Sequence, residues 1–287
     1  MRWEQAKVVM IAAFFLLDLF LGWRLYAGQA TAVAPAPAPA PLTVGNADTP
    51  GADVRFEGVL PSYPGSLPTL TIALQTPNAA AIAAHLLRTD YQVERQGSIM
   101  TYAGRAASIQ YTNGALLFQR VPATPSTAAP PTAGQARFEA DGFLARMAVA
   151  PANLEYDPAA SGQHGGAWDV AYDQRYQGQP LFNGHCDVTV DGGGVRAASC
   201  LWVRVIGPAQ SARPILAPAA ALQRVAAVQG ATASSPLVVD DIVLGYVAAT
   251  YPANAAWPTI PAWRVELADG SLYYVNAYTG TLVPGPN

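Results

Sequence analysis

The sequence is poor in charged residues, and this scarcity excludes several classes of function. Only 12% of the 287 residues are Asp, Glu, Lys or Arg, and Lys7 is the only lysine. The formal net charge is −3, and the arginines form no cluster. Proteins that bind nucleic acid or anionic lipid surfaces rely on clustered positive charge. We therefore expect this chain to bind neither.

Catalytic and metal-binding patterns are also missing. The chain has three histidines and two cysteines, and no pair among them has metal-ligand spacing. The motifs G-x-S-x-G, H-E-x-x-H and S-x-x-K do not occur. The run DGGG at residues 191–194 precedes an expected strand rather than a helix, which makes it a poor phosphate cradle. We expect no enzymatic activity, no metal and no cofactor.

His185, Cys186 and Asp187 are adjacent, and three such residues invite a catalytic interpretation. Neighbouring residues of a strand point to opposite faces, so these three cannot act together on one substrate. A hydrolase is the alternative, and a reactive thiol at Cys186 would favour it.

One long hydrophobic run is present, at the start of the chain. Asp18 is the only ionisable residue between Val8 and Trp23. Because Arg24 can extend toward the headgroups, the usable span reaches Tyr26, close to the ~20 residues that cross a bilayer. We predict a transmembrane helix over residues 7–26. A cleaved signal peptide is the alternative, but its apolar segment is normally shorter.

The charges around this span predict its orientation. Arg2 and Lys7 precede the apolar run, and only Arg24 follows it before a long stretch without basic residues. The positive-inside rule places residues 1–6 in the cytoplasm and the region after the helix outside. We expect a single-pass protein of the cell membrane with extracytoplasmic C-terminal domains.

Asp18 lies near the middle of the span, where a carboxylate costs at least ~2.5–3.5 kcal/mol and usually faces a partner. Gly22, one turn further on, allows a second helix to approach closely. We predict that one helix face contacts partner helices through Phe14, Phe15, Asp18, Leu21 and Gly22. The alternative is a protonated Asp18 that the apolar run tolerates.

Residues 27–52 form a Pro/Ala-rich linker, in which the tract APAPAPAP favours extended polyproline II. A first small α+β domain is expected over residues 53–121. It would have a strand at Thr69–Leu74 and a helix that ends near Arg88, with Thr76 as N-cap and Pro77 as the first helical residue. Asn113-Gly114 predicts a tight hairpin. The antiparallel strands are expected at Tyr91–Arg95, Ser98–Tyr102, Ser108–Thr112 and Ala115–Arg120.

A second linker, residues 122–135, leads to a C-terminal domain over residues 136–287. Helices are expected at Ala136–Ala148 and from Pro218 to just before Gly230. The predicted fold class is α+β, with an N-terminal transmembrane helix and two small extracytoplasmic domains of antiparallel sheet with helices packed on one face. The strands of the C-terminal domain are expected at Ala167–Gln177, Leu181–Val190, Val195–Ile206, Leu237–Thr250, Ala262–Leu267 and Leu272–Ala277.

Cys186 and Cys200 are symmetric about Gly193. In a hairpin centred there they would face each other, near enough to form a disulfide. The apolar positions are even before the turn and odd after it, so this register requires a bulge near the glycines or near Cys200. We predict a Cys186–Cys200 disulfide, with two free thiols as the alternative.

Several separated segments together resemble the YycI family. The N-terminus MRWEQAKVVMIAAFFLLDLFLGWRLY is similar to the family opening, in which W-x-x-x-K leads into a hydrophobic span. Residues 176–184, YQGQPLFNG, resemble its segment Y-x-G-x-P-I-F-x-x. Residues 261–265, PAWRV, and 273–280, YYVNAYTG, resemble its closing motif and also that of PepSY-type domains. The proline-rich linker and the two cysteines depart from the family pattern.

The resemblance implies a single-pass membrane regulator with an extracytoplasmic α+β region and no catalytic residues. Its partners would be a YycH-like membrane protein and the sensor histidine kinase of the YycFG (WalKR) cell-wall two-component system. A PepSY-type extracytoplasmic inhibitor or binding module is the alternative. For Trp263, Tyr273 and Tyr274 we expect core packing rather than a ligand site.

Overall fold

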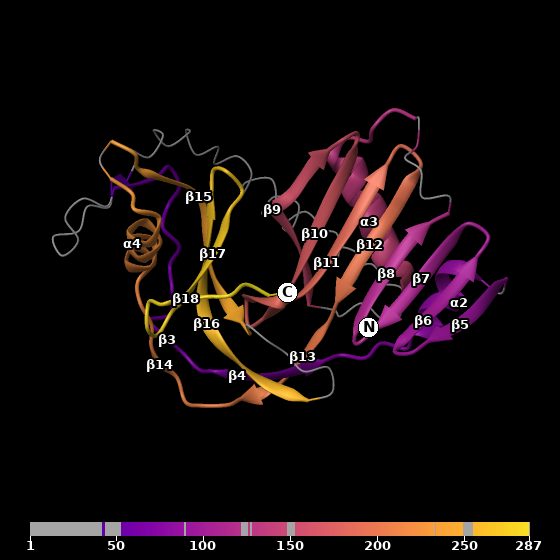
Figure 1. Cartoon of the computed structure of the whole chain (residues 1–287), viewed down its shortest axis with the longest axis horizontal. Helices are drawn as coiled ribbons and strands as arrows, with labels where there is room; N and C mark the ends of the chain where they lie inside the picture. The colour runs from indigo at the N-terminus through magenta and orange to yellow at the C-terminus, as the bar shows by residue number, and fades with distance from the viewer. Residues whose placement is uncertain are drawn as a thin grey trace, which may run out of the picture. The chain divides into compact units, whose positions relative to one another are not determined.

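A computed structural model describes residues 42–43, 53–88, 90–121, 126, 128–147, 153–232, 234–248 and 255–286. The predicted transmembrane helix, residues 7–26, lies outside these ranges. Within them, no helix is both long enough and apolar enough to cross a membrane. The described part is a mixed, strand-rich fold (Figure 1). It contains three helices, α2 (Ala79–Leu87), α3 (Ala133–Met147) and α4 (Pro218–Gln229).

Capping explains where the helices begin and end. The N-cap of α2 is Asn78 rather than Thr76, because the Asn78 side chain accepts a hydrogen bond from the Ala81 N–H at 3.1 Å. α3 begins three residues earlier than expected, where the Thr132 and Gln135 side chains each accept a hydrogen bond from the other residue's backbone N–H. α4 matches the prediction, and Gly230 ends it in the left-handed conformation, with φ 65°.

The chain from Tyr91 to Arg120 is a four-stranded antiparallel meander. At its last turn Asn113 and Gly114 both have positive φ, 46° and 88°, which the predicted tight hairpin requires. Its strands are β5 (Tyr91–Gln96), β6 (Ile99–Gly104), β7 (Ala107–Thr112) and β8 (Ala115–Arg120).

β8 continues the meander into a larger antiparallel sheet, because it pairs with a strand from much later in the chain. The order is β5-β6-β7-β8-β12-β11-β10-β9. Helices α2 and α3 cover one face, where Ile82, Phe143 and Met147 pack against Ile109 and Val188. The added strands are β12 (Gly194–Leu201), β11 (Gln179–Asp191), β10 (Ala167–Tyr176) and β9 (Leu154–His164).

The rest of the fold is built on β15 (Leu237–Val247) and β16 (Ala256–Leu267), which pair antiparallel. Helix α4 packs here, and Leu222 and Val225 share a core with Trp263. The other strands are β2 (Val54–Phe56), β4 (Leu70–Leu74), β13 (Val203–Pro208), β17 (Leu272–Asn276) and β18 (Leu282–Val283). Three two-residue strands complete the set, namely β1 (Leu42–Thr43), β3 (Ser66–Leu67) and β14 (Arg213–Pro214).

The strand pairing differs from the division at residues 122–135 that we expected. Residues 41–287 form one compact unit. β2 pairs with β15, and β4 pairs with β13 and β16, so early strands are hydrogen-bonded to late ones. Two separate small sheets, as expected, would each have edge strands with unpaired backbone groups. Pairing across the expected boundary satisfies these groups. The sheet is also mixed rather than purely antiparallel, since β15 lies parallel to β2 and, through Leu181 and Tyr246, to β11.

Candidate functional site

The structure confirms the predicted disulfide and locates its bulge. Cys186 on β11 is bonded to Cys200, directly opposite on β12. Both are buried in the core beneath α2 and α3. The register shifts between Thr189 and Val190, next to the glycine turn, which is one of the two places where a bulge was expected.

The apolar residues at odd positions after Cys200 have a second explanation besides the bulge. The chain leaves β12 at Trp202, and Val203 begins β13, which pairs with β4 instead of β11. Trp202 belongs to the same core as the disulfide, whereas Val203 belongs to a different core that contains Leu70 and Ile72. One long predicted strand is therefore two strands with different partners.

The predicted transmembrane contact residues lie outside the described residues, and they stay predictions. They are Phe14, Phe15, Asp18, Leu21 and Gly22.

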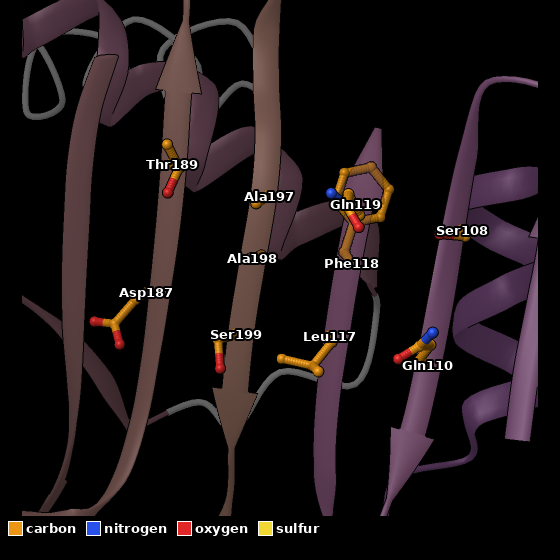
Figure 2. Close-up of a pocket in the computed structure, with 10 residues that line it drawn as sticks. All are labelled: Ser108, Gln110, Leu117, Phe118, Gln119, Asp187, Thr189, Ala197, Ala198 and Ser199. Atoms are coloured by element: carbon orange, nitrogen blue, oxygen red, sulfur yellow. The ribbon is translucent and has the colours of Figure 1, made fainter. Parts of the chain in front are cut away.

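The sheet face opposite α2 and α3 carries a shallow groove of about 280 Å³ (Figure 2). Cross-strand register places four groove residues in one row, in which Gln110 is opposite Leu117, Leu117 opposite Ser199, and Ser199 opposite Asp187. A second row contains Ser108, Gln119, Ala197 and Thr189. We call these two rows and the strand surface between them the polar groove.

The alternation of residues along each strand produces this face. In β7, Ile109 points into the core, whereas Ser108 and Gln110 line the groove. In β11, Cys186 is buried, whereas Asp187 and Thr189 line the groove. Cys186 therefore lies on the opposite face from its two neighbours, as predicted, and cannot act together with them. The groove offers amide and hydroxyl groups, one carboxylate, and the half-exposed side chain of Leu117.

Asp187 in the polar groove and Asp169 beside it make this end of the face negatively charged. His185 Nε2 lies 3.9 Å from Asp187 Oδ2, and the Asp187 side chain is 54% exposed. Partial burial and the nearby Asp169 carboxylate raise the Asp187 pKa, and His185 partly offsets this. Asp169 accepts a hydrogen bond from Thr189 Oγ1 at 2.7 Å and lies 3.5 Å from His164 Nδ1. Among the described residues, no group of three or more His, Cys, Asp or Glu is arranged to hold a metal ion.

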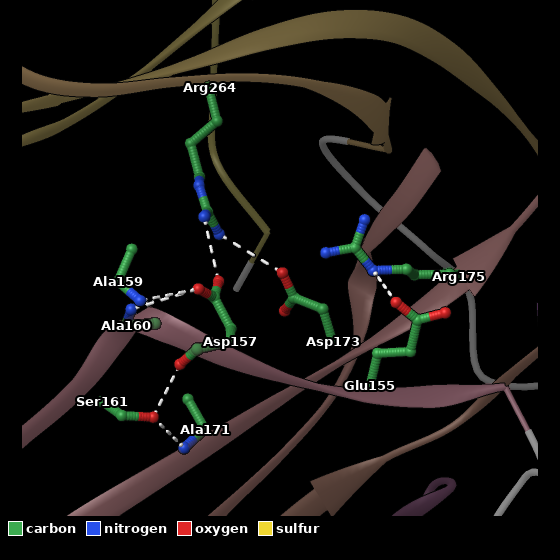
Figure 3. A network of polar contacts seen from close by, with 9 residues as sticks. All are labelled: Glu155, Asp157, Ala159, Ala160, Ser161, Ala171, Asp173, Arg175 and Arg264. Carbon is green, nitrogen blue, oxygen red and sulfur yellow. Dashed lines mark hydrogen bonds and ion pairs between the residues drawn. The ribbon is translucent and has the colours of Figure 1, made fainter. Parts of the chain in front are cut away.

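The same face ends at a buried cluster of one arginine and two aspartates (Figure 3). Arg264 on β16 donates from Nη2 to Asp157 Oδ2 at 3.0 Å and from Nη1 to Asp173 Oδ2 at 3.5 Å. Asp157 lies on β9 and Asp173 on β10, and the three side chains are between 9% and 12% exposed. The cluster joins β16 to the edge of the helix-covered sheet. Beside it, Arg175 and Glu155 form an ion pair at 2.9 Å.

The two carboxylates of this cluster have opposite pKa shifts. Burial opposes ionisation of Asp157, but Arg264 and the backbone N–H groups of Ala160 and Ala159 outweigh it and lower the Asp157 pKa. Among the described residues, no backbone N–H group contributes in this way at Asp173. Burial raises its pKa to about 6, since the Asp157 charge counteracts the benefit from Arg264. The cluster therefore contains one firmly ionised carboxylate and one that titrates in mildly acidic solution.

Two buried amide side chains also connect strands. The Asn183 amide pairs with both backbone groups of Ala248, donating to its carbonyl at 2.9 Å and accepting from its N–H at 2.7 Å. The Gln174 amide does the same at Val203, with distances of 2.5 and 3.0 Å. Each amide takes the place of a neighbouring strand, so two otherwise unpaired peptide groups are satisfied in the core.

Several residues of the motifs that resemble the YycI family also connect elements of the fold. Trp263 is fully buried, and its Nε1–H donates to the Leu216 carbonyl at 3.0 Å. Tyr274 is buried against Phe182, with ring centroids 5.3 Å apart. Asn276 Oδ1 accepts from the backbone N–H groups of Tyr278 and Thr279 in the last turn. Core packing, as expected, describes Trp263 and Tyr274. Tyr273 is only partly buried, and its hydroxyl accepts a hydrogen bond from the Gln229 amide.

Asp157 and Arg264 were not among the residues that the sequence predicts for a site. Strand β9 was not predicted, because Pro158 and the small residues after it resemble a loop. The position of Arg264 could have been noticed in the sequence, since it lies in a strand between Trp263 and Val265, both of which are buried. An arginine at such a position requires a carboxylate partner. No local pattern indicates which carboxylate that is.

Comparison with solved structures shows a likeness of fold alone. No family model and no curated protein sequence matches the chain. The structure is similar to that of an uncharacterized protein from Eubacterium rectale, with 12% identity and a TM-score of 0.54, covering 80% of this chain and 89% of that one. A second solved structure, the C-terminal domain of Bacillus megaterium YpeB, is 13% identical with a TM-score of 0.44. That match covers 73% of this chain and 96% of the YpeB domain. The first likeness shows that this fold occurs in a solved protein.

Proposed function

We propose that the chain is a single-pass membrane regulator without enzymatic activity, whose extracytoplasmic part binds other proteins. In this proposal it acts with a YycH-like membrane protein and modulates the sensor histidine kinase of a cell-wall two-component system. The hydrophobic run Val8–Tyr26, with Asp18 at its centre, supplies the anchor and a polar contact for partner helices.

The observation that best supports this proposal is the contact between two segments that resemble the YycI family. Residues 176–184 and 261–280 are distant in sequence, yet Phe182 packs against Tyr274. The Arg264 guanidinium lies over the Phe182 ring, 5.3 Å from its centroid. A resemblance carried by residues that pack together favours a common fold over coincidence of short motifs.

A second candidate function is a PepSY-type extracytoplasmic inhibitor or binding module. The polar groove favours it, because an open face lined by hydrogen-bonding side chains suits a ligand that lies across the strands. The two candidates differ at the N-terminus. Retention of the anchor favours the membrane regulator, and removal of residues before the linker favours the binding module.

Affinity capture from membranes tests the proposal directly. The full-length protein, tagged at its C-terminus, is solubilised in mild detergent and captured, and the co-purified proteins are identified. We expect the sensor kinase and a YycH-like protein. Asp18→Leu and Gly22→Leu should each reduce their recovery, while Leu17→Ala, on the other helix face, should not. Recovery of neither protein with the unaltered chain would refute the proposal.

A further inference from the structure

We propose that the polar groove binds an extended polypeptide segment that carries arginine or lysine, with the cationic group beside Asp187 and Asp169. This inference concerns the outer sheet face alone. It does not depend on which proteins the membrane helix contacts.

Four aspartates surround Ala171 on this face. Asp157 and Asp187 lie opposite Ala171 on the two flanking strands, and Asp169 and Asp173 lie two residues before and after it on its own strand. The four carboxylates thus project from one face of three adjacent strands. Like charges so close repel one another, and each lowers its energy by gaining a cationic partner.

Arg264 provides that partner for only half of the group. It contacts Asp157 and Asp173, as described above, and so leaves Asp187, which lines the groove, and Asp169, which lies beside it opposite Thr189. Within the described part of the chain, these two have only histidines as cationic neighbours, His164 and His185, at 3.5 and 3.9 Å. Their side chains are 45% and 54% exposed, so a partner can reach them. The chain's own arginine therefore shows how a guanidinium is held at one end of the face, and the other end lacks one.

The rest of the groove suits a polypeptide rather than an isolated cation. Gln110 and Gln119 can each donate to a carbonyl and accept from an N–H, and Ser108, Ser199 and Thr189 add hydroxyl groups. The row from Gln110 to Asp187 crosses four strands, which at about 4.8 Å per strand spans ~14 Å. That length accommodates about four residues of extended chain at ~3.4 Å each.

Leu117 lies in the middle of this row, between Gln110 and Ser199, and is 42% exposed. An exposed leucine can contact the aliphatic stem of a lysine or arginine whose charged end reaches Asp187. The groove therefore combines groups that can hydrogen-bond a peptide, an apolar contact, and a carboxylate whose cationic neighbour is a histidine. An arginine- or lysine-containing segment complements all three features.

Fluorescence anisotropy with the full-length chain in zwitterionic nanodiscs tests this assignment. The probe is a labelled, end-blocked pentapeptide Ala-Val-Arg-Val-Ala, whose β-branched residues favour an extended backbone. The matched peptide has glutamine in place of arginine. We expect saturable binding of the arginine peptide and at least about fivefold weaker binding of the glutamine peptide.

Three variants localise the site. Asp187→Asn should weaken the arginine peptide about fivefold. Ser199→Lys, which places a positive charge opposite Asp187, should weaken it at least about tenfold. Asp240→Asn removes an exposed aspartate on β15, away from the groove, and should leave affinity unchanged. Thermal unfolding of each variant checks that it is folded, and if Ser199→Lys does not fold, Asp187→Asn decides alone.

Three outcomes would overturn the proposal. The first is equal affinity for the arginine and glutamine peptides, which would assign the groove to an uncharged ligand. The second is an arginine-peptide affinity that Asp187→Asn leaves unaltered, which would place binding elsewhere on an acidic surface. The third is no detectable binding of the arginine peptide at about 1 mM, a range within which weak peptide sites are measurable.

Discussion

Arg264 Nη2 and Asp157 Oδ2 lie 3.0 Å apart although the two residues are separated by 107 positions in the sequence. The contact joins β16 to β9, and both side chains are 9% exposed. The Asp157 carboxylate also accepts hydrogen bonds from the N–H groups of Ala159 and Ala160, which orient it toward the arginine. This pair is a buried, charged link between the α4 side of the fold and the helix-covered sheet.

Removal of the arginine should therefore be costly. Arg264→Leu leaves two buried carboxylates without their cation, and we expect it to lower the free energy of unfolding by about 3–5 kcal/mol at neutral pH. Urea denaturation followed by tryptophan fluorescence measures the change. Arg204→Leu is the matched control, because Arg204 is exposed on β13 and its loss should alter stability by less than about 0.5 kcal/mol. Equal midpoints for the two variants would contradict the prediction.

The free energy of unfolding should depend on pH through the titration of Asp173. The pKa of Asp173 is raised to about 6 in the folded protein, so the folded state holds this proton more tightly than the unfolded state does. The resulting contribution to the free energy of unfolding is complete below the usual aspartate pKa and is lost as the pH rises through 6. Asp173→Asn removes this loss. Relative to the unaltered protein, the variant should gain on the order of 1 kcal/mol between pH 5 and pH 7.5, because the unfolded aspartate is already mostly ionised at pH 5.

The neighbouring aspartate should behave in the opposite sense. The Asp157 pKa is lowered, so its contribution is present above the usual aspartate pKa and is lost only in strong acid. Asp157→Asn should therefore destabilise the protein at both pH 5 and pH 7.5. Urea titrations of both variants at the two pH values decide the matter, and parallel pH dependence for Asp173→Asn and the unaltered chain would count against it.

The disulfide should contribute to stability and be inaccessible to reagents. Cys186 and Cys200 are separated by 14 residues and are buried. Closing a loop of this size is worth ~3 kcal/mol, so the Cys186→Ala/Cys200→Ala double variant should be less stable by about that amount. Mass spectrometry of the native protein after treatment with an alkylating agent should show no modified thiol. Two alkylated cysteines on freshly isolated protein would exclude the bond.

The Asn183 amide should contribute strongly to the free energy of unfolding. Asn183→Ala leaves the N–H and carbonyl of Ala248 unpaired in the core, and each buried orphan costs about 1–3 kcal/mol. We expect a loss of about 2–5 kcal/mol of unfolding free energy. Gln119→Ala, an exposed amide of the polar groove, should change stability by less than about 0.5 kcal/mol. A similar effect of both substitutions would show that the amide pairing is dispensable.

The predicted topology can be tested in cells. Protease added to intact protoplasts should digest residues 53–287 and leave the N-terminal helix with the membrane, because the charges around that helix favour a cytoplasmic N-terminus. Complete protection of residues 53–287 would contradict the orientation. Their appearance as a soluble mature protein would instead identify residues 7–26 as a signal peptide.

Local patterns were sufficient for the elements whose structure is determined locally. The hairpin at Asn113-Gly114 and the start of α4 at Pro218 depend on turn and capping chemistry within a few residues. The disulfide was also predictable, because the symmetry of Cys186 and Cys200 about a turn is a property of one hairpin.

Partner choice between distant strands was not predictable. The alternation in β8 shows which of its side chains are buried, but nothing in it names β12 as the neighbour. The same limit applies to the candidate site, since the carboxylates around Ala171 become a group only when β9, β10 and β11 are in register. Residues such as Arg264 and Asn183 indicate that a partner exists, and tertiary structure alone supplies it.

The pairing of β2 and β4 with late strands has a consequence for biosynthesis. β2 is made near the start of the folded part, but its partner β15 is made near the end. At about 5–20 residues per second, β2 waits roughly 10–40 s for that partner. During this interval β2 and β4 present unpaired edges on which other chains can assemble. The open edge of β2 therefore persists until the last quarter of the chain is being synthesised, and a chaperone that shields residues 53–74 would protect the nascent protein during that interval.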